Sequence, residues 1–271
     1  MRNLSYEAKH SYRIMKTIYE TDDGTSAFYE AFDDIEKRKV GIKAVAVAPK
    51  DLQKAKSEAL TLHRFATMST SIPALYHTYY DQKQERFYLI MQLIEQGRTL
   101  EHMLQGTIPI HQSLQILIDL CDALIPLHQK KYQHRDLKPA NIMVQNRNVY
   151  LIDFNLTSSK PFKGEGTTFY RSPEQDINSK GVGQDKTDIF SIGVIFYQMV
   201  TGHLPVRGQE YVPDRSGKKW RFFTKPIEKN KRVPQEISDL IEKCMQINPN
   251  DRPVNANELK RLLIQLKRRV R

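Results

Sequence analysis

Cysteine, tryptophan and long apolar runs are scarce in this sequence. Two of its 271 residues are cysteines and one is a tryptophan. Cys121 and Cys244 stand alone in apolar, helix-like surroundings, which favours core packing in a reducing compartment over a disulfide or a metal site. No apolar run reaches the roughly 18 residues of a membrane span, and the first residues lack the apolar core of a signal peptide. We therefore expect a cytoplasmic location and no transmembrane segment.

Acidic residues are outnumbered as well, 31 against 42 basic residues, and the formal net charge is +11. A charge of this size favours acidic substrates, anionic membranes or nucleic acid by long-range attraction. No RNA-binding motif accompanies it. We therefore predict no dedicated nucleic-acid site and expect most of these charges on solvated faces.

The most informative stretch lies in the middle of the chain. The run His134-Arg135-Asp136-Leu137-Lys138-Pro139-Ala140-Asn141 places a carboxylate, an ammonium group and an amide close together. Two short apolar runs, 142–144 and 149–152, follow it and predict two strands joined by a tight turn. Asp153-Phe154-Asn155 comes directly after the second run. Such a hairpin brings Asn141 and Asp153 together at its open end.

These side chains suit phosphate chemistry with magnesium. Mg²⁺ prefers a few oxygen ligands together with substrate phosphates, and the Asn141 amide and the Asp153 carboxylate can provide such oxygens. Asp136 would face the same space, where a carboxylate that binds no metal can orient a hydroxyl group and accept its proton. Lys138 offers positive charge to a moving phosphoryl group.

At these residues the chain resembles the eukaryotic-type, or Hanks-type, serine/threonine protein kinase family. The resemblance covers residues 12–266 and implies a two-lobed α+β fold. A small β-rich N-lobe would span about 12–91, a hinge 92–97 and a larger helical C-lobe about 98–266, with no second domain. ATP would bind in the cleft between the lobes with Mg²⁺, for which Mn²⁺ could substitute. Lys138, two residues after Asp136, is typical of the serine/threonine branch.

The resemblance assigns several residues of the first lobe to ATP. The strand 40–45 resembles the Val-Ala-Ile-Lys strand of kinases, with Gly41 in place of alanine, and Lys43 would contact the α- and β-phosphates. Helical periodicity over 51–65 places Glu58 where the helix glutamate of the family pairs with that lysine. The alternative for Glu58 is a solvated helix residue.

The adenine pocket is assigned by position. Phe28 would cover the base, and backbone groups of Gln92 and Ile94 in the hinge would hydrogen-bond it. Met91 would lie behind the pocket, and Met143 would contact the base from the second lobe.

Glycine is missing where the resemblance most requires it, in the lid over the phosphates. Thr21, Asp23 and Ser26 stand where the three lid glycines belong, and only Gly24, out of frame, is glycine. Side chains at these positions hinder close approach of the backbone to phosphate, and an acidic side chain repels it. We therefore expect ATP binding to be weakened but retained.

The segment after residue 155 resembles a kinase activation segment. In the family, an arginine at the position of Arg135 commonly binds the phosphate of a phosphorylated Ser or Thr, which lies about four residues before a docking threonine. Thr167 is that threonine by position, and Lys163 stands at the phosphorylation position. Glu165 would instead supply a standing charge to Arg135, so that no activating phosphorylation is needed. The alternative for Glu165 is a solvated loop residue. The wall that docks the protein substrate would contain Thr167, Thr168 and Tyr170.

Other residues would support this site. Asp188 opens a stretch, 189–200, that is apolar nearly all round and predicts a buried helix, with Phe190 where tryptophan is more usual. Arg252 would pair with Glu174 and brace the activation segment. Structural positions of the family are also occupied by His134, Arg135 and Phe154.

Two residues, Asn155 and Pro126, depart from the pattern expected at their positions, and each leads to a prediction about the backbone. Asn155 replaces the glycine that usually follows Asp153 and Phe154, and we expect it to enter the left-handed region of the backbone as a glycine would. Pro126 lies inside an apolar helix predicted over 113–129, which it should kink or end.

The region 206–232 is the least kinase-like part of the chain. It is rich in basic residues with aromatic residues between them, and it predicts either an irregular surface loop packed by its aromatic rings or a docking surface for an acidic partner. The basic residues are Arg207, Arg215, Lys218, Lys219, Arg221, Lys225, Lys229, Lys231 and Arg232, and the aromatic ones are Tyr211, Trp220, Phe222 and Phe223.

The resemblance implies transfer of the γ-phosphoryl group of ATP to Ser or Thr hydroxyls of a protein substrate. Two alternatives stay open. A pseudokinase or nucleotide-binding scaffold would explain the missing lid glycines, although all five polar positions of the site are retained. A kinase-fold enzyme that acts on a small molecule or a lipid is the other alternative.

Overall fold

The computed structural model describes residues 10–158, 164–175, 186–206, 211 and 220–270, together with the backbone of 3–6. The chain divides into two compact units, Met1–Gln96 and Gly97–Arg271. Strands dominate the first unit and helices the second, which is the two-lobed α+β class expected from the sequence.

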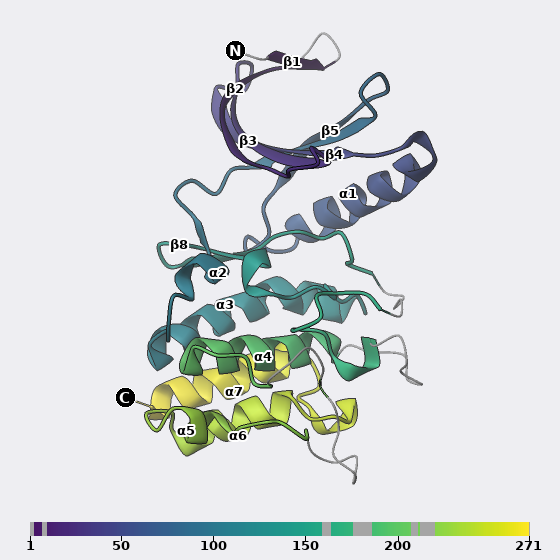
Figure 1. Ribbon diagram of the computed structural model, residues 1–271. Coiled ribbons are helices and arrows are strands. Elements are labelled where there is room, and N and C mark those ends of the chain that lie inside the picture. Colours follow the sequence, from purple (N-terminus) through teal and green to yellow (C-terminus); the bar gives the residue numbers. More distant parts are fainter. Residues whose placement is uncertain are drawn as a thin grey trace. The chain divides into compact units, whose positions relative to one another are not determined.

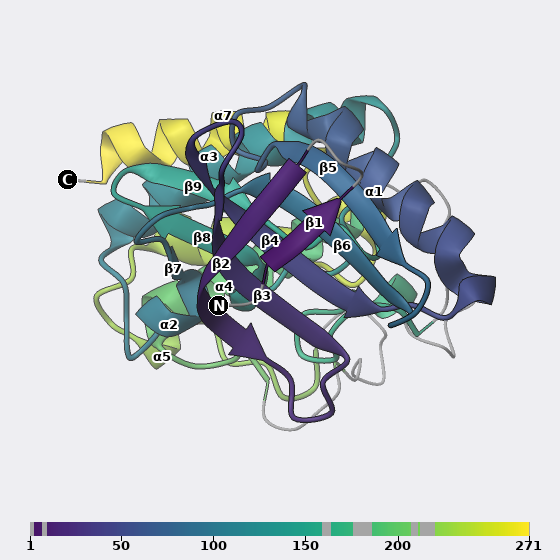
Figure 2. The same ribbon diagram turned by 90° about the horizontal axis from the view of Figure 1, so that it is seen from above.

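The first unit is built on a six-stranded antiparallel sheet in the order β1-β2-β3-β4-β6-β5 (Figure 1), and β1 lies beside β2 at one edge (Figure 2). Residues 40, 42 and 44 of β4 alternate toward a buried cluster that also contains Ile90 of β6. The other face of β4 therefore carries Gly41 and Lys43. The strands are β1 (Asn3–Tyr6), β2 (His10–Glu20), β3 (Ser26–Asp33), β4 (Arg38–Ala46), β5 (Leu75–Asp81) and β6 (Arg86–Gln92).

One long helix accompanies this sheet. A short 3₁₀ turn, η1 (Pro49–Asp51), leads into α1 (Leu52–Ala66), and Pro49 suits the first position of such a turn because it needs no hydrogen-bonded N–H. The helix packs against β5 and β6 through Ala59, Leu62 and Phe65. This packing presents Glu58, one position before Ala59, at the margin of the buried stripe.

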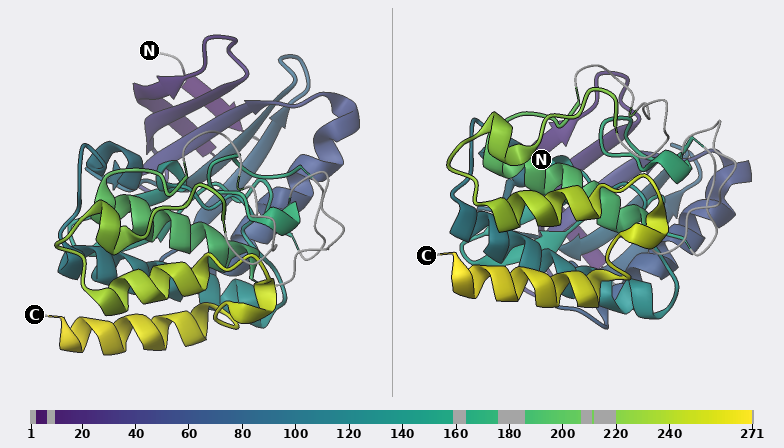
Figure 3. Two further views of the ribbon diagram at one scale, coloured as in Figure 1. Left: turned by 60° about the horizontal axis from the view of Figure 1, so that its bottom comes forward. Right: turned by 90° about the horizontal axis from the view of Figure 1, so that it is seen from below.

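The second unit is mainly helical, with a small sheet of order β7-β8-β9. Helix α3 packs against α4 and α7, and α4 packs against α6, so that these helices lie side by side (Figure 3). Short 3₁₀ turns are η2 (Pro139–Asn141), η3 (Pro173–Gln175) and η4 (Pro249–Asp251). The strands and α-helices are β7 (Arg98–Thr99), α2 (Leu100–Met103), α3 (Ile110–Gln129), β8 (Ile142–Gln145), β9 (Asn148–Leu151), α4 (Thr187–Thr201), α5 (Pro226–Lys229), α6 (Gln235–Cys244) and α7 (Ala256–Arg269).

The central helix α4 is buried almost throughout, as its apolar sequence predicts. At Gly193 a Cβ atom would come 2.7 Å from Met245 Cγ and 2.8 Å from Cys244 Cβ, so glycine permits the close approach of α4 to α6. The helix ends at Gly202, whose φ of 73° is the left-handed conformation that glycine adopts without strain.

The expectation that Pro126 could end its helix was wrong. Helix α3 continues through the proline to Gln129. The carbonyl of Pro126 still accepts a hydrogen bond from the N–H of Lys130 at 3.3 Å. The last turn of the helix, which follows the proline, therefore keeps a backbone hydrogen bond.

Helix α3 also bears on the question of a membrane span. In the described part of the chain it is the one helix long and apolar enough to meet the length and hydropathy of a span. Its apolar residues are largely buried among the other helices of the unit, including Leu117, Leu120 and Leu124 at 0 % exposure. A mostly buried core helix accounts for this apolar sequence.

Candidate active site

A buried carboxylate on α4 holds the loop that carries Asp136. Asp188 accepts hydrogen bonds from the backbone N–H groups of His134 (2.9 Å) and Arg135 (3.0 Å). Arg135 has a φ of 68°, a left-handed conformation that costs a non-glycine residue of order 1–3 kcal/mol unless its surroundings hold it. The two bonds to Asp188 hold the chain in this conformation, which turns the next residue, Asp136, toward the site.

His128 was missed by the sequence analysis. Its Nδ1 accepts a hydrogen bond from the N–H of Ala256 (3.1 Å), so its Nε2 carries the proton and donates to Asp188 Oδ2 (2.9 Å). Burial by itself would raise the pKa of the Asp188 carboxyl, but the hydrogen bonds from His128 and from the N–H of Arg135 hold it below its ordinary value. The only sequence signal was a histidine on the apolar stripe of a helix, one turn after Leu124.

Around Asp136 the structure brings together the residues predicted for phosphate transfer. Asp136 Oδ1 accepts hydrogen bonds from the hydroxyl (2.7 Å) and N–H (2.8 Å) of Thr167. Lys138 Nζ lies 2.9 Å from Asp136 Oδ2 and donates to the Thr167 hydroxyl at 3.0 Å. Asn141 Nδ2 donates to the backbone oxygen of Asp136 at 2.8 Å and to its Oδ2 at 3.3 Å. A carboxylate, an ammonium group and a hydroxyl therefore share one small site.

The predicted hairpin is present as β8 and β9, with Asn141 and Asp153 at its open end. The N–H of Ile152 donates to the carbonyl of Asn141 at 2.9 Å, which ties the residue before Asp153 to Asn141. Because the amide nitrogen of Asn141 is directed at Asp136, its Oδ1 points away from Asp136. Among the described residues no three His, Cys, Asp or Glu side chains gather as a metal cage, and Mg²⁺ that also binds phosphate needs fewer protein ligands.

The expected backbone role of Asn155 was wrong. The left-handed residue of this segment is Asp153, with a φ of 64°, and Asn155 is not among the described residues of positive φ. Phe154 next to it is 4 % exposed, and its ring meets the His134 ring edge-on, with centroids 5.3 Å apart. Packing of Phe154 against the catalytic loop therefore fixes the turn, and Asn155 is left exposed.

We expect Asn155→Gly to leave phosphotransfer close to the wild-type rate or slightly above it. Neither the backbone conformation of residue 155 nor a buried contact would be lost. Initial rates of the two proteins at saturating ATP test this. A strong drop would show that the Asn155 side chain has a role in the site.

A buried ion pair also joins the activation segment to the catalytic loop. Arg135 Nη1 lies 2.8 Å from Glu165 Oε1, and the two side chains are 1 % and 3 % exposed. Arg135 Nε also donates to the carbonyl of Ser158 at 3.3 Å. Glu165 is therefore no solvated loop residue, while Lys163 lies outside the described residues. Thr168 is exposed, and Tyr170 donates its hydroxyl proton to Gln198 Oε1 at 2.7 Å.

Glu174 and Arg252 form the brace expected between them. Arg252 binds the carboxylate through both terminal nitrogens, at 2.6 and 2.9 Å, and its side chain is 0 % exposed. The guanidinium group lies over the Phe190 ring, 5.0 Å from the centroid. This bidentate pair connects the end of the activation segment to the turn before α7.

Part of the basic region, residues 207–210 and 212–219, lies outside the described residues. Two of the described aromatic side chains pack inward: Trp220 Nε1 donates to the carbonyl of Met245 at 2.7 Å, and the rings of Tyr211 and Trp220 meet Phe190 edge-on. Phe222, in contrast, is 55 % exposed. Phe190, which is smaller than the tryptophan more usual at this position, is therefore covered by two rings from this region. Docking of an acidic partner there stays a prediction.

In the first unit, Lys43 lies on β4 opposite Phe28 of β3, and Glu58 lies on α1. The N–H of Gln92 donates to the carbonyl of Ala74 at 2.8 Å, and the expected backbone contacts of Gln92 and Ile94 with a base stay a prediction. Ile94 is 9 % exposed, and in the second unit Met143 of β8 is half-buried.

The glycine-poor lid is a tight turn organised by Asp23. Its Oδ1 accepts hydrogen bonds from the N–H of Thr25 (2.9 Å) and from the hydroxyls of Thr21 and Thr25 (both 2.7 Å). These bonds lower the pKa of Asp23 to about 2, and the bond from the Thr25 N–H has the largest effect. The carboxylate therefore keeps its negative charge at any physiological pH. Gly24 supplies the left-handed residue of the turn, with a φ of 66°.

We expect Asp23→Gly to tighten ATP binding, because it removes a negative charge and a side chain from the lid. Asp23→Asn is the matched control, since it removes the charge but keeps an oxygen that can accept the three hydrogen bonds. Calorimetric titration with MgATP measures both. If Asp23→Gly binds ATP more weakly than the wild type, the acidic turn assists the metal or the phosphates instead of opposing them.

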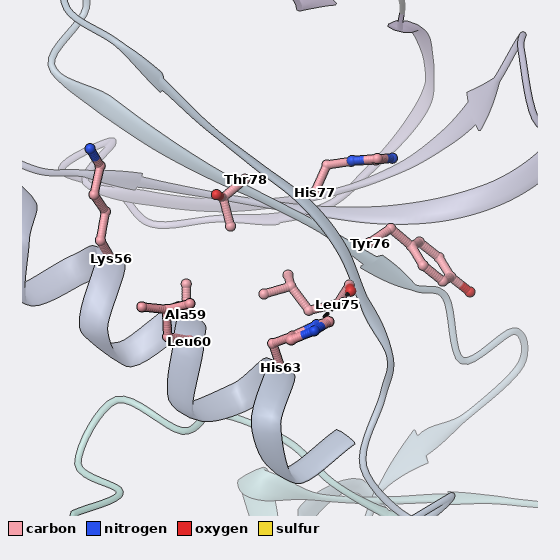
Figure 4. Close-up of a pocket in the computed structure, with 8 residues that line it drawn as sticks. All are labelled: Lys56, Ala59, Leu60, His63, Leu75, Tyr76, His77 and Thr78. Carbon is pink, nitrogen blue, oxygen red and sulfur yellow. Dashed lines mark hydrogen bonds between the residues drawn. The ribbon is translucent and has the colours of Figure 1, made fainter. Parts of the chain in front are cut away.

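A groove of about 330 Å³ lies elsewhere in the first unit, between α1 and β5 (Figure 4). Ala59, Leu60 and Leu75 form its apolar floor, and His63 lies close to the Leu75 carbonyl. None of the residues predicted for ATP lines it.

Comparison with known proteins decides the family. A family model described as the protein kinase domain matches residues 23–262. The chain belongs to the protein kinase family. Similar proteins include a probable serine/threonine-protein kinase of Clostridium acetobutylicum, 29 % identical over 87 % of this chain, and the serine/threonine-protein kinase PrkC of Bacillus subtilis, 26 % identical over 92 %. The serine/threonine-protein kinase PknB of Mycolicibacterium smegmatis is 30 % identical over 66 % of this chain.

These relatives are longer proteins. The chain spans 37 % of the Clostridium acetobutylicum protein, 39 % of PrkC and 30 % of the Mycolicibacterium smegmatis protein. The part of each relative that this kinase resembles is therefore less than half of its length.

Proposed function

We propose that this kinase transfers the γ-phosphoryl group of ATP to Ser or Thr hydroxyls of protein substrates, with Mg²⁺ or Mn²⁺, and that residues 12–266 form its catalytic domain. The observation that carries the proposal is the geometry at Asp136. Its Oδ1 accepts a hydrogen bond from one hydroxyl group already, that of Thr167, with Lys138 bridging the two side chains.

The residues of this site have separate tasks. Asp136 orients the substrate hydroxyl and accepts its proton as the oxygen attacks the γ-phosphorus. Lys138 balances the negative charge of the transferring group. Lys43 positions the α- and β-phosphates, with Glu58 as its proposed partner. Positioning and charge stabilisation supply most of the catalysis in such transfers.

The residues at the open end of the β8–β9 hairpin are suited to bind Mg²⁺. Asn141 Oδ1 is turned away from Asp136 because its amide nitrogen donates to that residue, and Asp153 follows at the other side of the hairpin. One amide oxygen and one carboxylate match the small protein share of a Mg²⁺ site that also binds phosphate. When bound, the metal would neutralise the charge of the phosphates.

The remaining proposals concern partners and location. A protein with an acidic face is the proposed partner of region 206–232, and a cytoplasmic location is proposed with it. The structure does not favour either alternative function, since the Asp136, Lys138 and Asn141 contacts of an active site are intact.

Radiolabelled ATP offered with a basic protein, an acidic protein, a lipid mixture and a small-alcohol mixture separates these functions. A protein kinase labels protein, and the label disappears in Asp136→Asn. A pseudokinase labels nothing although calorimetry shows nucleotide binding, and label in lipid or alcohol alone would show another substrate class.

A further inference from the structure

Arg135 joins two buried peptide planes, and its left-handed conformation depends on how both planes are held. The N–H of the first plane donates to Asp188 at 3.0 Å. The carbonyl of the second plane, which connects Arg135 to Asp136, accepts a hydrogen bond from Gln175 Nε2 at 2.9 Å. The first plane sets φ of Arg135 and the second sets ψ, because a residue has only these two soft backbone angles. The direction in which the chain enters Asp136 therefore depends on Gln175.

Gln175 is itself held in one orientation. Its side-chain oxygen accepts hydrogen bonds from the N–H (3.0 Å) and the hydroxyl (3.2 Å) of Ser172, so the amide nitrogen is the atom that faces the Arg135 carbonyl. Its backbone carbonyl accepts a hydrogen bond from the N–H of Gly164 at 2.8 Å. The residue is 2 % exposed. A buried side chain bonded through both ends of its amide is a firm support for the peptide that it contacts.

The activation segment passes close to this contact at Gly166, one residue before Thr167. A Cβ atom at Gly166 would come 2.7 Å from the Arg135 carbonyl oxygen and 3.2 Å from Gln175 Nε2. Gly166 also has a φ of 81°, a left-handed conformation that glycine adopts without strain. Glycine at this position therefore leaves room for the bond between Gln175 and the peptide that precedes Asp136.

We propose that Gln175 is a positioning residue, which aims the Asp136 carboxylate by holding the Arg135–Asp136 peptide in place. This inference rests on the proposed function. Two contacts from the activation segment then act on the same residue, Glu165 on the side chain of Arg135 and Gln175 on its backbone. Without the amide N–H of Gln175 the buried carbonyl loses a hydrogen bond and the peptide can turn. Asp136 is then misplaced relative to the substrate hydroxyl, while nucleotide binding is unaffected.

Gln175→Glu tests the contact with the smallest change, because glutamate keeps the oxygen that accepts from Ser172 and replaces only the amide nitrogen. It lowers kcat about tenfold, since a small misplacement of a reacting group can cost up to about a hundredfold. Gln175→Met, which brings no charge into the interior, lowers kcat as well. Ser172→Ala is the matched control: the backbone N–H still holds the Gln175 oxygen, and kcat stays near the wild-type value. Calorimetry gives the wild-type MgADP affinity for all three variants, and thermal unfolding shows that they are folded.

A double variant separates positioning from a merely structural role. In the Asp136→Asn background, Gln175→Glu does not lower the residual rate further, because no base is left to be aimed. A structural role would lower the rate by the same factor in both backgrounds. An equal loss in both backgrounds, a wild-type kcat in both Gln175 variants, or a loss of MgADP affinity would each overturn the positioning role alone. Wild-type protein that transfers no phosphate to protein would overturn the proposed function as well.

Discussion

Asp136→Asn is expected to lower phosphotransfer by roughly 10²–10⁴, the usual contribution of a positioned general base. Asparagine has the shape of aspartate and keeps an oxygen that can accept the hydrogen bonds of Thr167. It cannot take up the proton of a substrate hydroxyl, and it removes the charge opposite Lys138. Initial rates of phosphotransfer at saturating ATP measure the loss.

The control for this variant is nucleotide binding. Asp136 is proposed to bind neither metal nor phosphate, so calorimetry with MgADP should give nearly the wild-type affinity, and thermal unfolding should occur near the wild-type temperature. Phosphotransfer by Asp136→Asn at the wild-type rate would remove Asp136 from the mechanism.

Glu165→Gln is expected to lower activity strongly in a protein that is otherwise active without phosphorylation. Glu165 is the carboxylate that neutralises the buried guanidinium of Arg135. Breaking a buried pair from one side typically costs about 3–5 kcal/mol, because a charge is left without compensation. That cost falls on the activation segment, which must move to let water or another anion reach Arg135, and the Thr167 contacts to Asp136 are lost with it.

Ser158→Ala is the matched control for Glu165→Gln. Residue 158 touches the same arginine through its backbone carbonyl, which alanine keeps. Phosphatase-treated wild-type protein and Ser158→Ala should both retain most of the initial rate, while Glu165→Gln should not. Wild-type protein that is inactive after dephosphorylation and recovers only by autophosphorylation would contradict the standing charge at Glu165.

Features that depend on short stretches of the sequence were predicted from it. Alternation of short apolar runs gave the β8–β9 hairpin and with it the placement of Asn141 and Asp153. The continuous apolar stretch after Asp188 gave the buried helix α4. The resemblance to the protein kinase family gave the ion pairs of Glu165 and Glu174 with their distant arginines, which no local pattern would have shown.

Features set by tertiary contacts or by backbone angles were not predicted. The left-handed residue is Asp153 and not Asn155, because packing of Phe154 on His134 fixes the turn. Helix α3 tolerates Pro126 because burial of its apolar face outweighs one missing backbone hydrogen bond. The bridge from Ala256 through His128 to Asp188 joins α7, α3 and α4, and no periodicity in one segment reveals it. The ring of Phe28 lies so close to Gly41 that a Cβ atom there would come 2.5 Å from Phe28 Cζ, and this fit likewise depends on the β3–β4 register.

The identity of the phosphorylated residue tests the central proposal most directly. Wild-type protein and Asp136→Asn are incubated side by side with ATP labelled in the γ-phosphate and a mixture of unlabelled proteins, which are then hydrolysed to amino acids. Our account predicts labelled phosphoserine and phosphothreonine from the wild type and a loss of both in Asp136→Asn. Label in phosphotyrosine alone, or equal label from both proteins, would contradict it.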